Sequence, residues 1–339
     1  MSEYLLRTLF VHTPGTRLVL DAEAVKALRD DAPPRRLPLQ QIDTIVVAGG
    51  VDVSTPLLIK CAEDGRTIAF VSKYGKPRAV VEGAMSGRGR LRRHQYIRHL
   101  DDDARTSLAA DVVRGKLGNL AWAMRQWRRD ASGDRADRLH NGALRVEELM
   151  LQLRDSGSRA EVMGVEGAAT RVYFGALGAA MRDADWTGRS RRPARDPVNA
   201  CLSWVYGMTR IAALGALHVV GLDPYCGFLH GDTDGQPSLA LDLMEEFRPS
   251  SDRIVVSLLN RRQLRDEHFV YDVLGTCSLT AEGRDVLMGA WHKHRASTVA
   301  VHRAQVPIKR AALPIVQANV LANALRTASG YEPHQVVLR

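Results

Sequence analysis

A histidine and a group of carboxylates lie close together in residues 221–249, GLDPYCGFLHGDTDGQPSLALDLMEEFRP. His230 ends a short apolar run, and a Gly- and Asp-rich loop separates it from an apolar-periodic segment that holds Asp242, Glu245 and Glu246. Gly and Pro punctuate both ends, which predicts a turn, a loop and one buried helix. Asp242 and Glu245 are three residues apart and therefore share one face of that helix.

These carboxylates are surrounded by apolar residues, and a buried carboxylate needs a partner such as a divalent metal ion. The alternative is ordinary: a histidine beside an acidic helix is usually a satisfied polar residue, and Glu-Glu is usually a solvated face. For this segment alone, the ordinary interpretation is the better one.

A second segment changes that balance. Residues 159–181, RAEVMGVEGAATRVYFGALGAAM, have the apolar periodicity of a helix, and Glu166 falls on its apolar stripe. A single glutamate there could simply reach solvent from the edge of the stripe. Two helices that each carry an acid among apolar residues, with His230 at a turn between them, are a rarer coincidence. Two carboxylates and an imidazole without a thiolate suit Mn²⁺ or Mg²⁺ and disfavour structural zinc.

Several motifs now carry a family resemblance. VEGAATRVYF, PVNACLSWVYG, GLDPYCGFLHG and LALDLMEEFRP, in this order and spacing, resemble the CRISPR-associated adaptation integrases, and STPLLIKCAEDG followed by FVSKYGKP does so in the N-terminal part. The resemblance extends from about residue 4 to about residue 330. Each motif is loose, but the ordered set is specific.

The resemblance implies a metal-dependent DNA endonuclease and integrase, an enzyme of phosphodiester hydrolysis and strand transfer (EC 3.1 class). A 3′-hydroxyl of captured foreign DNA would attack a phosphodiester of the CRISPR array. Glu166, His230 and Glu245 fall on the metal-ligand positions, and Asp242 on the additional catalytic acid. Other members carry Asp where this chain has Glu245, which is an equivalent oxygen ligand. Arg248 would meet the phosphate charge.

Partners are implied in the same way. They are double-stranded DNA, a second copy of the chain in a homodimer, and a small ferredoxin-like CRISPR-associated protein that bridges two dimers. Two other functions stay open: a stand-alone metal nuclease that only cuts branched DNA, and a non-catalytic basic architectural protein.

The elements that would position this site predict an α+β fold. Residues 1–83 are β-rich with one helix after Ser54 and form a small N-terminal β-domain, which we interpret as a dimerisation module. Residues 5–12 and 17–20 flank Thr-Pro-Gly, a hairpin-like turn. Residues 84–99 are a basic linker, and residues 100–339 form a larger all-α catalytic domain. Residues 332–339 are expected to be disordered or to order on binding.

Two arginine-rich segments are candidate DNA contacts, because guanidinium groups form forked bonds with phosphates. The alternatives are a solvated linker and a mobile surface loop. The candidates, in residues 84–99 and 182–197, are Arg88, Arg90, Arg92, Arg93, Arg189, Arg191 and Arg192. Glu246 is expected to point away from the site, toward a surface arginine.

Overall charge agrees with a polyanionic partner. The 339 residues carry 47 Lys and Arg against 38 Asp and Glu, giving a net charge of +9. The four cysteines are far apart in sequence, which predicts neither a zinc ribbon nor a redox pair and fits a reducing cytoplasm. The N-terminus lacks a signal-peptide pattern, and no stretch approaches a membrane span, so no membrane association is expected.

Overall fold

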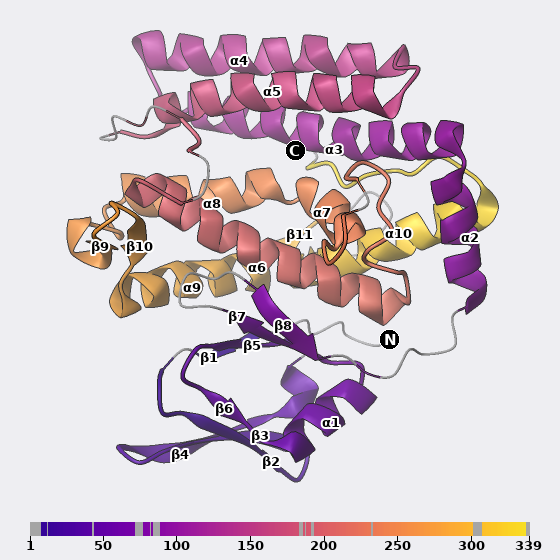
Figure 1. The fold of residues 1–339 in the computed structure, drawn as a ribbon. Helices are drawn as coiled ribbons and strands as arrows, with labels where there is room; N and C mark the ends of the chain where they lie inside the picture. The colour runs from indigo at the N-terminus through magenta and orange to yellow at the C-terminus, as the bar shows by residue number, and fades with distance from the viewer. Residues whose placement is uncertain are drawn as a thin grey trace.

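The structure is a computed structural model that describes residues 8–11, 13–42, 44–71, 77–81, 83, 89–182, 186, 188–190, 193–231, 233–300 and 307–336. A small β-rich part lies on one side, and a larger, mostly helical part lies on the other (Figure 1). This is the predicted α+β class.

The described residues of the β-rich part form two four-stranded sheets and one α-helix. The first sheet has the order β1-β5-β7-β8, in which the first three strands are parallel and β8 is antiparallel to β7. The second has the order β4-β3-β2-β6. The bounds are β1 Thr8–Val11, β2 Arg17–Asp21, β3 Ala24–Arg29, β4 Ala32–Pro38, β5 Thr44–Ala48, β6 Asp52–Val53, α1 Thr55–Glu63, β7 Thr67–Val71 and β8 Pro77–Val81.

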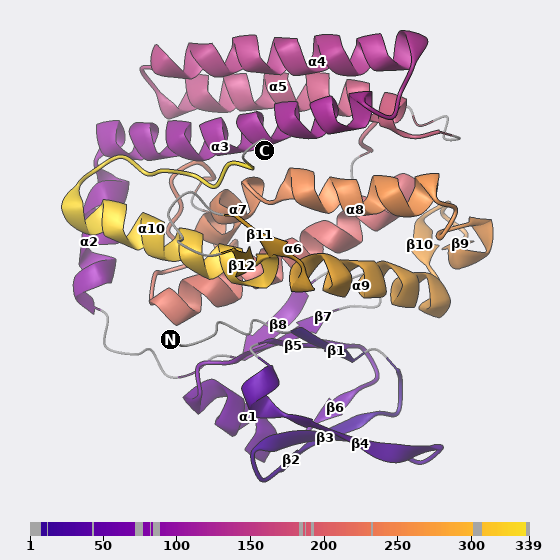
Figure 2. The same ribbon diagram turned by 180° about the vertical axis from the view of Figure 1, so that it is seen from behind.

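The first sheet is buried on both faces. Successive side chains of a strand point to opposite faces, so Ile45 and Val47 enter the core of the β-rich part while Val46 joins the core of the helices. A Cβ at Gly215 of α6 (Pro197–Val220) would lie 3.3 Å from the Thr67 hydroxyl of β7, so the helix packs directly on the sheet. The helical part therefore packs on one face of this sheet (Figure 2).

The predicted hairpin around Thr-Pro-Gly is wrong. β1 pairs in parallel with β5 of the first sheet, whereas β2 pairs with β3 and β6 of the second. The turn, with Gly15 at a φ of 77°, connects two sheets instead of two neighbouring strands. A turn motif fixes a local reversal, but burial of both faces of β5 decides which strand lies beside it.

The larger part contains nine of the described α-helices and two short two-stranded sheets, so it is mostly rather than wholly helical. Its helices are α2 Gly89–Leu100, α3 Asp102–Arg128, α4 Gly133–Leu151, α5 Arg159–Ala180, α6 Pro197–Val220, α7 Ser238–Glu245, α8 Arg248–Asn260, α9 Ala281–Ala296 and α10 Leu313–Thr327. The short strands are β9 Phe269–Tyr271, β10 Cys277–Leu279, β11 Thr298–Val299 and β12 Ile308–Lys309. α3, α4 and α5 form a layer of roughly antiparallel helices over α6, α7 and α8 (Figures 1 and 2).

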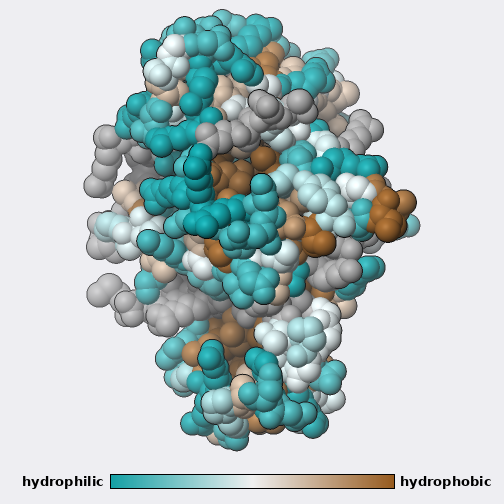
Figure 3. Space-filling view, turned by 90° about the vertical axis from the view of Figure 1, so that its left-hand side faces the viewer, coloured by the Kyte–Doolittle hydropathy of each residue, from teal (hydrophilic) through white to brown (hydrophobic). Residues whose placement is uncertain are grey.

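α6 is the central helix of this part. Asp196 caps its start by accepting the Asn199 N–H at 2.8 Å, and Gly221, at a φ of 87°, ends it. Contrary to the sequence expectation, α6 is long and apolar enough to cross a membrane by length and composition, but 83% of that window is buried inside the protein. On the side seen in Figure 3, hydrophobic residues form separate patches within a largely hydrophilic surface. The composition of α6 is that of a core helix.

The predicted linker is helical from its sixth residue onward, because residues 89–100 are α2.

The C-terminal segment also differs from the prediction. Tyr331 and His334 are buried, and the Asn119 side-chain amide of α3 donates to the His334 carbonyl at 2.8 Å and accepts the Val336 N–H at 2.9 Å. Residues 332–336 are thus docked on the core, and residues 337–339 lie outside the described residues.

Candidate active site

Asp242 holds the loop that carries His230. Its fully buried carboxylate accepts the backbone N–H groups of Phe228 at 2.6 Å, Leu229 at 3.0 Å and His230 at 3.0 Å. The same carboxylate lies 2.7 Å from His230 Nδ1, which donates to it because a carboxylate only accepts. Nε2 of His230 is left to face the site.

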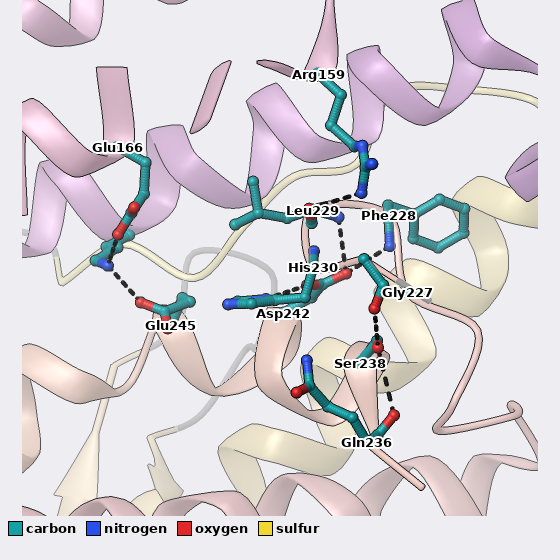
Figure 4. Close-up of polar contacts among 12 residues, drawn as sticks. Arg159, Glu166, Gly227, Phe228, Leu229, His230, Gln236, Ser238, Asp242 and Glu245 are labelled. Atoms are coloured by element: carbon teal, nitrogen blue, oxygen red, sulfur yellow. Dashed lines mark hydrogen bonds and ion pairs between the residues drawn. The ribbon is translucent and has the colours of Figure 1, made fainter. Parts of the chain in front are cut away.

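The His230 ring points toward Glu245 (Figure 4). Burial alone lowers the pKa of His230, but the hydrogen bond and negative charge of Asp242, helped by Glu245, outweigh burial and raise the pKa above its ordinary value. A histidine whose second nitrogen bonds a carboxylate has a fixed tautomer and a more basic free nitrogen.

Glu245 is the buried acid at the end of α7. Its Oε1 accepts a 2.8 Å hydrogen bond from Arg248, and its Oε2 lies 2.6 Å from Nζ of Lys116. Burial raises the pKa of Glu245, but the charges of Arg248, Lys116 and His230 prevail and lower it to about 2. Glu245 is therefore a carboxylate at neutral pH.

Glu166 reaches the same place from α5. Its Oε1 forms an ion pair with Lys116 and accepts the Thr170 hydroxyl at 2.9 Å. The side chain of Lys116 is only 3% exposed. Sequence reasoning missed this lysine, although its position four residues after Val112 and four before Leu120 places it on the apolar stripe of α3.

The structure thus brings Glu166 and Glu245 together through Lys116, and turns His230 toward Glu245. Within the described part of the chain, no three His, Cys, Asp or Glu side chains are grouped closely enough to hold a metal ion as they stand. The chemistry of the donors still fits a hard divalent ion, with two carboxylates and one imidazole. In addition, Oε2 of Glu245 is buried and lacks a partner with hydrogen-bond geometry, although the Lys116 ammonium is close.

A cavity of 710 Å³ opens beside these residues, between α6, α7 and the β9–β10 hairpin. His230 and Glu245 lie on its wall together with the guanidinium groups of Arg78, Arg189, Arg210 and Arg248. Arg248 lies over the ring of Tyr206, 4.3 Å from its centroid. This wall can take a phosphate group next to the acids.

The Tyr206 ring is itself fixed from behind. Its hydroxyl donates to the buried Asp252 carboxylate at 2.6 Å, and the Tyr173 hydroxyl donates to the other oxygen at 2.7 Å. Burial raises the pKa of Asp252, and the hydrogen bonds of the two tyrosines only partly offset that effect. The network joins α5, α6 and α8 beneath Arg248.

α2 clamps the loop that precedes His230. Its fully buried Gln95 donates to the Asp223 and Cys226 carbonyls at 2.8 and 2.9 Å and accepts the Asp223 N–H at 2.9 Å. Nδ1 of His99 lies 2.7 Å from the Gly227 carbonyl. Gly227 is needed here, since a Cβ would lie 2.9 Å from Oδ2 of Asp242. The arginine-rich segment therefore also positions the site.

The predicted basic residues lie in different places. Arg189 and Arg248 are half-buried on the cavity wall, where Arg189 donates to the Asn199 side chain at 2.7 Å. On α2, Arg90 and Arg93 are exposed and Arg92 is half-buried. Arg88, Arg191 and Arg192 lie outside the described residues.

Glu246 does not point to a surface arginine. It is 1% exposed and accepts hydrogen bonds from the Tyr331 hydroxyl, from the His334 N–H at 2.6 Å and from Gln317 at 3.2 Å. Burial raises its pKa to about 8 despite these bonds. It anchors the C-terminal segment on α7 and α10, a role that requires contacts almost 90 residues away in sequence.

Known proteins are similar to this chain over most of its length. The profile of the family described as CRISPR associated protein Cas1 matches residues 9–293. A CRISPR-associated endonuclease Cas1 of Rhodospirillum rubrum is 37% identical over 332 residues, which cover 95% of this chain and 96% of that protein. One from Moorella thermoacetica is 36% identical over 330 residues, with the same coverage.

Solved structures share the fold. The Cas1 protein of Thermotoga maritima has a TM-score of 0.81 at 20% identity, over 98% of this chain and all of that one. A casposase bound to integration product has a TM-score of 0.83 at 19% identity, over 98% of this chain and 96% of that one. The Cas1-containing chain of a Cas6-RT-Cas1–Cas2 complex has a TM-score of 0.82 at 20% identity, with this chain covering 37% of it.

Proposed function

This chain belongs to the Cas1 family of CRISPR-associated endonucleases, and from that membership we propose that it inserts captured DNA into a CRISPR array by transesterification. A 3′-hydroxyl of the incoming DNA attacks a phosphodiester of the array, so one P–O bond forms as another breaks and the displaced strand leaves with a 3′-hydroxyl. The observation that carries the proposal is the cluster of His230, Glu245 and Arg248 on the wall of a 710 Å³ cavity that is lined by several arginines.

The proposed cofactor is a divalent ion, Mn²⁺ or Mg²⁺, which Glu166, His230 and Glu245 would hold. Such an ion, when bound, polarises a phosphate and orients the attacking hydroxyl. Asp242 keeps the His230 ring in place with Nε2 free, through the 2.7 Å bond to Nδ1. Arg248 neutralises Glu245 and offers its remaining N–H groups to a phosphate in the cavity.

The proposed partners are double-stranded DNA, a second copy of this chain, and a small ferredoxin-like protein that bridges two dimers. Support comes from the net charge of +9, from the arginines of the cavity and α2, and from the similarity to chains solved in a Cas1–Cas2 complex and in a DNA integration product. We also propose the cytoplasm as its compartment, in keeping with four cysteines that are widely separated in sequence.

A strand-transfer assay tests the function. A labelled duplex with 3′-hydroxyl ends is incubated with a CRISPR-array plasmid, Mn²⁺ and the chain, with and without its small partner. Glu166→Ala, His230→Ala and Glu245→Ala should each abolish the joined product while DNA binding stays nearly intact. Glu148→Ala, which removes an exposed carboxylate of α4, is the matched control.

The products separate this function from its rivals. Cut but unjoined strands would identify a stand-alone nuclease. DNA binding without any chemistry, unaffected by a chelator, would identify an architectural protein. Normal joining by one of the three variants would remove that residue from the site.

A further inference from the structure

Lys116 stands where the two acidic ligands of the proposed ion meet. Its ammonium forms an ion pair with Glu166 Oε1 and lies 2.6 Å from Glu245 Oε2. Its side chain is 3% exposed, so the ammonium has given up nearly all of its contact with water. A buried lysine at such a place is stable only because of the charges it meets.

The surroundings explain why the chain needs a cation there. Glu245 is 5% exposed at its side chain and has one oxygen bonded to Arg248, which leaves its second oxygen facing Lys116. Glu166, reaching in from another helix, has only the Thr170 hydroxyl and Lys116 as partners that the structure records. Two carboxylates brought together in a poorly solvated place repel each other unless a positive charge lies between them.

A divalent ion held by both carboxylates would need the same space. Mg²⁺ keeps its oxygen ligands at about 2.0–2.1 Å, so an ion shared by Glu166 and Glu245 cannot coexist with an ammonium between the same two oxygens. The positive charges of the ammonium and the ion would also repel each other so close together. Within the described residues, no three His, Cys, Asp or Glu side chains converge on one point. This agrees with the Lys116 ammonium occupying the space between Glu166 and Glu245.

We propose that Lys116 is an internal counterion for the metal site: it holds Glu166 and Glu245 together when no ion is bound, and a divalent ion must displace it to bind. The proposal rests on the metal dependence proposed above. The side of Glu166, whose side chain is 25% exposed, is more open to solvent than the side of Glu245, whose side chain is 5% exposed, so the ammonium would leave past Glu166. Lys116 is thus a positioning residue that sets how tightly the site takes its ion.

Lys116 should therefore affect the ion-free and the ion-bound protein in opposite ways. Removing the ammonium strips the acids of their cation and should lower the melting temperature measured with a chelator. The same change removes the competitor, so the ion should bind more tightly, since an apparent affinity equals the intrinsic affinity multiplied by the fraction of molecules that are competent to bind. A ligand that binds the folded state more tightly also raises the melting temperature further.

The test compares Lys116→Met, which keeps the apolar stem and most of the length of the side chain, with the wild-type protein. Calorimetric titration with Mn²⁺ should show a dissociation constant lower by about tenfold or more in the variant. Differential scanning fluorimetry should show a lower melting temperature in chelator and a larger rise on adding Mn²⁺. Lys60→Met is the matched control, because Lys60 also bridges two carboxylates, Glu23 at 3.1 Å and Asp64 at 3.3 Å, far from the site.

A second measurement needs no variant. Acylation of wild-type amines by an N-hydroxysuccinimide ester, read by mass spectrometry, should modify Lys116 several-fold faster in Mn²⁺ than in chelator, with Lys60 unchanged. Equal or weaker Mn²⁺ binding by Lys116→Met, or Lys116 acylation that does not respond to Mn²⁺ in a protein that binds it, would overturn this inference alone. Failure of the wild-type protein to bind Mn²⁺ would overturn the proposed metal dependence and this inference with it.

Discussion

Glu245 and Glu246 are neighbours in sequence with opposite electrostatic environments. Both are buried, yet the pKa of Glu245 falls to about 2, because the charges of Arg248, Lys116 and His230 outweigh burial. Burial raises the pKa of Glu246 to about 8, because the hydrogen bonds of its neutral partners only partly offset it. At neutral pH the first is a charged ligand candidate and the second is a neutral hydrogen-bonding group. The direction that each side chain takes from α7 therefore decides its chemistry.

Conservative substitutions at three acids of α7 should separate their roles. Glu245→Gln should lose Mn²⁺ binding, because a neutral amide is a poor ligand for a hard cation. Glu246→Gln should keep Mn²⁺ binding, because glutamine resembles the protonated acid that it replaces. Asp242→Asn should keep the ion but slow strand transfer by about 10–100-fold, as loss of a bond to a ligating histidine does. Calorimetric titration and the strand-transfer rate measure these effects; loss of Mn²⁺ by Glu246→Gln with retention by Glu245→Gln would reverse the assignment.

At the scale of elements, the site depends on segments that carry no ligand. α2 holds the turn before His230 through Gln95, and the C-terminal segment holds α7 through Glu246. The first was expected to be a basic linker that contacts DNA, or else is solvated, and the second to be disordered or to order on binding. Their backbone and side-chain polar groups are instead paired inside the protein, where an unpaired group is costly.

Gln95→Ala should damage the site without touching a ligand. The change leaves the buried carbonyls of Asp223 and Cys226 and one N–H unpaired, which costs about 1–3 kcal/mol for each group that water cannot reach. The turn should then loosen, and strand transfer should fall while DNA binding persists. Leu100→Ala, which shortens an exposed side chain at the end of the same helix, is the control. Strand transfer by Gln95→Ala at the rate of the control would show that the turn before His230 does not need this clamp.

Glu246 should make the stability of the fold depend on pH. Its pKa is about 8 in the folded chain against an ordinary value of 4.5, so the folded state keeps a proton that the unfolded state releases in this window. Its contribution to stability is complete below pH 4.5 and is lost as the pH rises through 8, with a slope of up to about 1.4 kcal/mol per pH unit. The melting temperature of Glu246→Gln should therefore fall less than that of the wild-type protein between pH 5 and 8, which scanning calorimetry measures. Parallel curves would show that Glu246 is already ionised in the fold.

At the scale of the whole molecule, positive charge is distributed over two places. Arginines line the cavity beside the acids. Two others, Arg90 and Arg93, lie on the exposed face of α2, the first helix after the β-rich part. In the proposed function, the first set would act on a reacting phosphate. The second set is our candidate for contacts with the DNA backbone, because exposed guanidinium groups bind phosphates.

Reversing charge at Arg88, Arg90 and Arg93 to Glu should weaken DNA binding without removing the ion. Each phosphate that the variant no longer neutralises should flatten the dependence of log K on log salt concentration by roughly one unit. Fluorescence anisotropy at several salt concentrations gives the slope, and Mn²⁺ titration of the same variant gives the control. An unchanged slope would favour the alternative interpretation of this segment as a solvated linker.

Local patterns in the amino-acid order were enough to predict several parts of this protein. Apolar periodicity located α5, Ser54 marked the start of α1, and the ordered motifs pointed to Glu166, His230 and Glu245. These features depend on residues that are close in sequence, within one or two helical turns, so the amino-acid order is enough to predict them. Family membership follows from the same linear information.

Which distant residues meet could be learned only from the folded chain. The fold pairs β1 with β5 instead of β2, places Lys116 between Glu166 and Glu245, and closes the C-terminal segment over Glu246. Its place on the apolar stripe of α3, four residues from Val112 and from Leu120, is also that of a lysine whose stem lies along a helix and whose ammonium reaches water. Its role is fixed by burial against α5 and α7, because the free energy of a buried charge depends on the charges that the fold brings beside it.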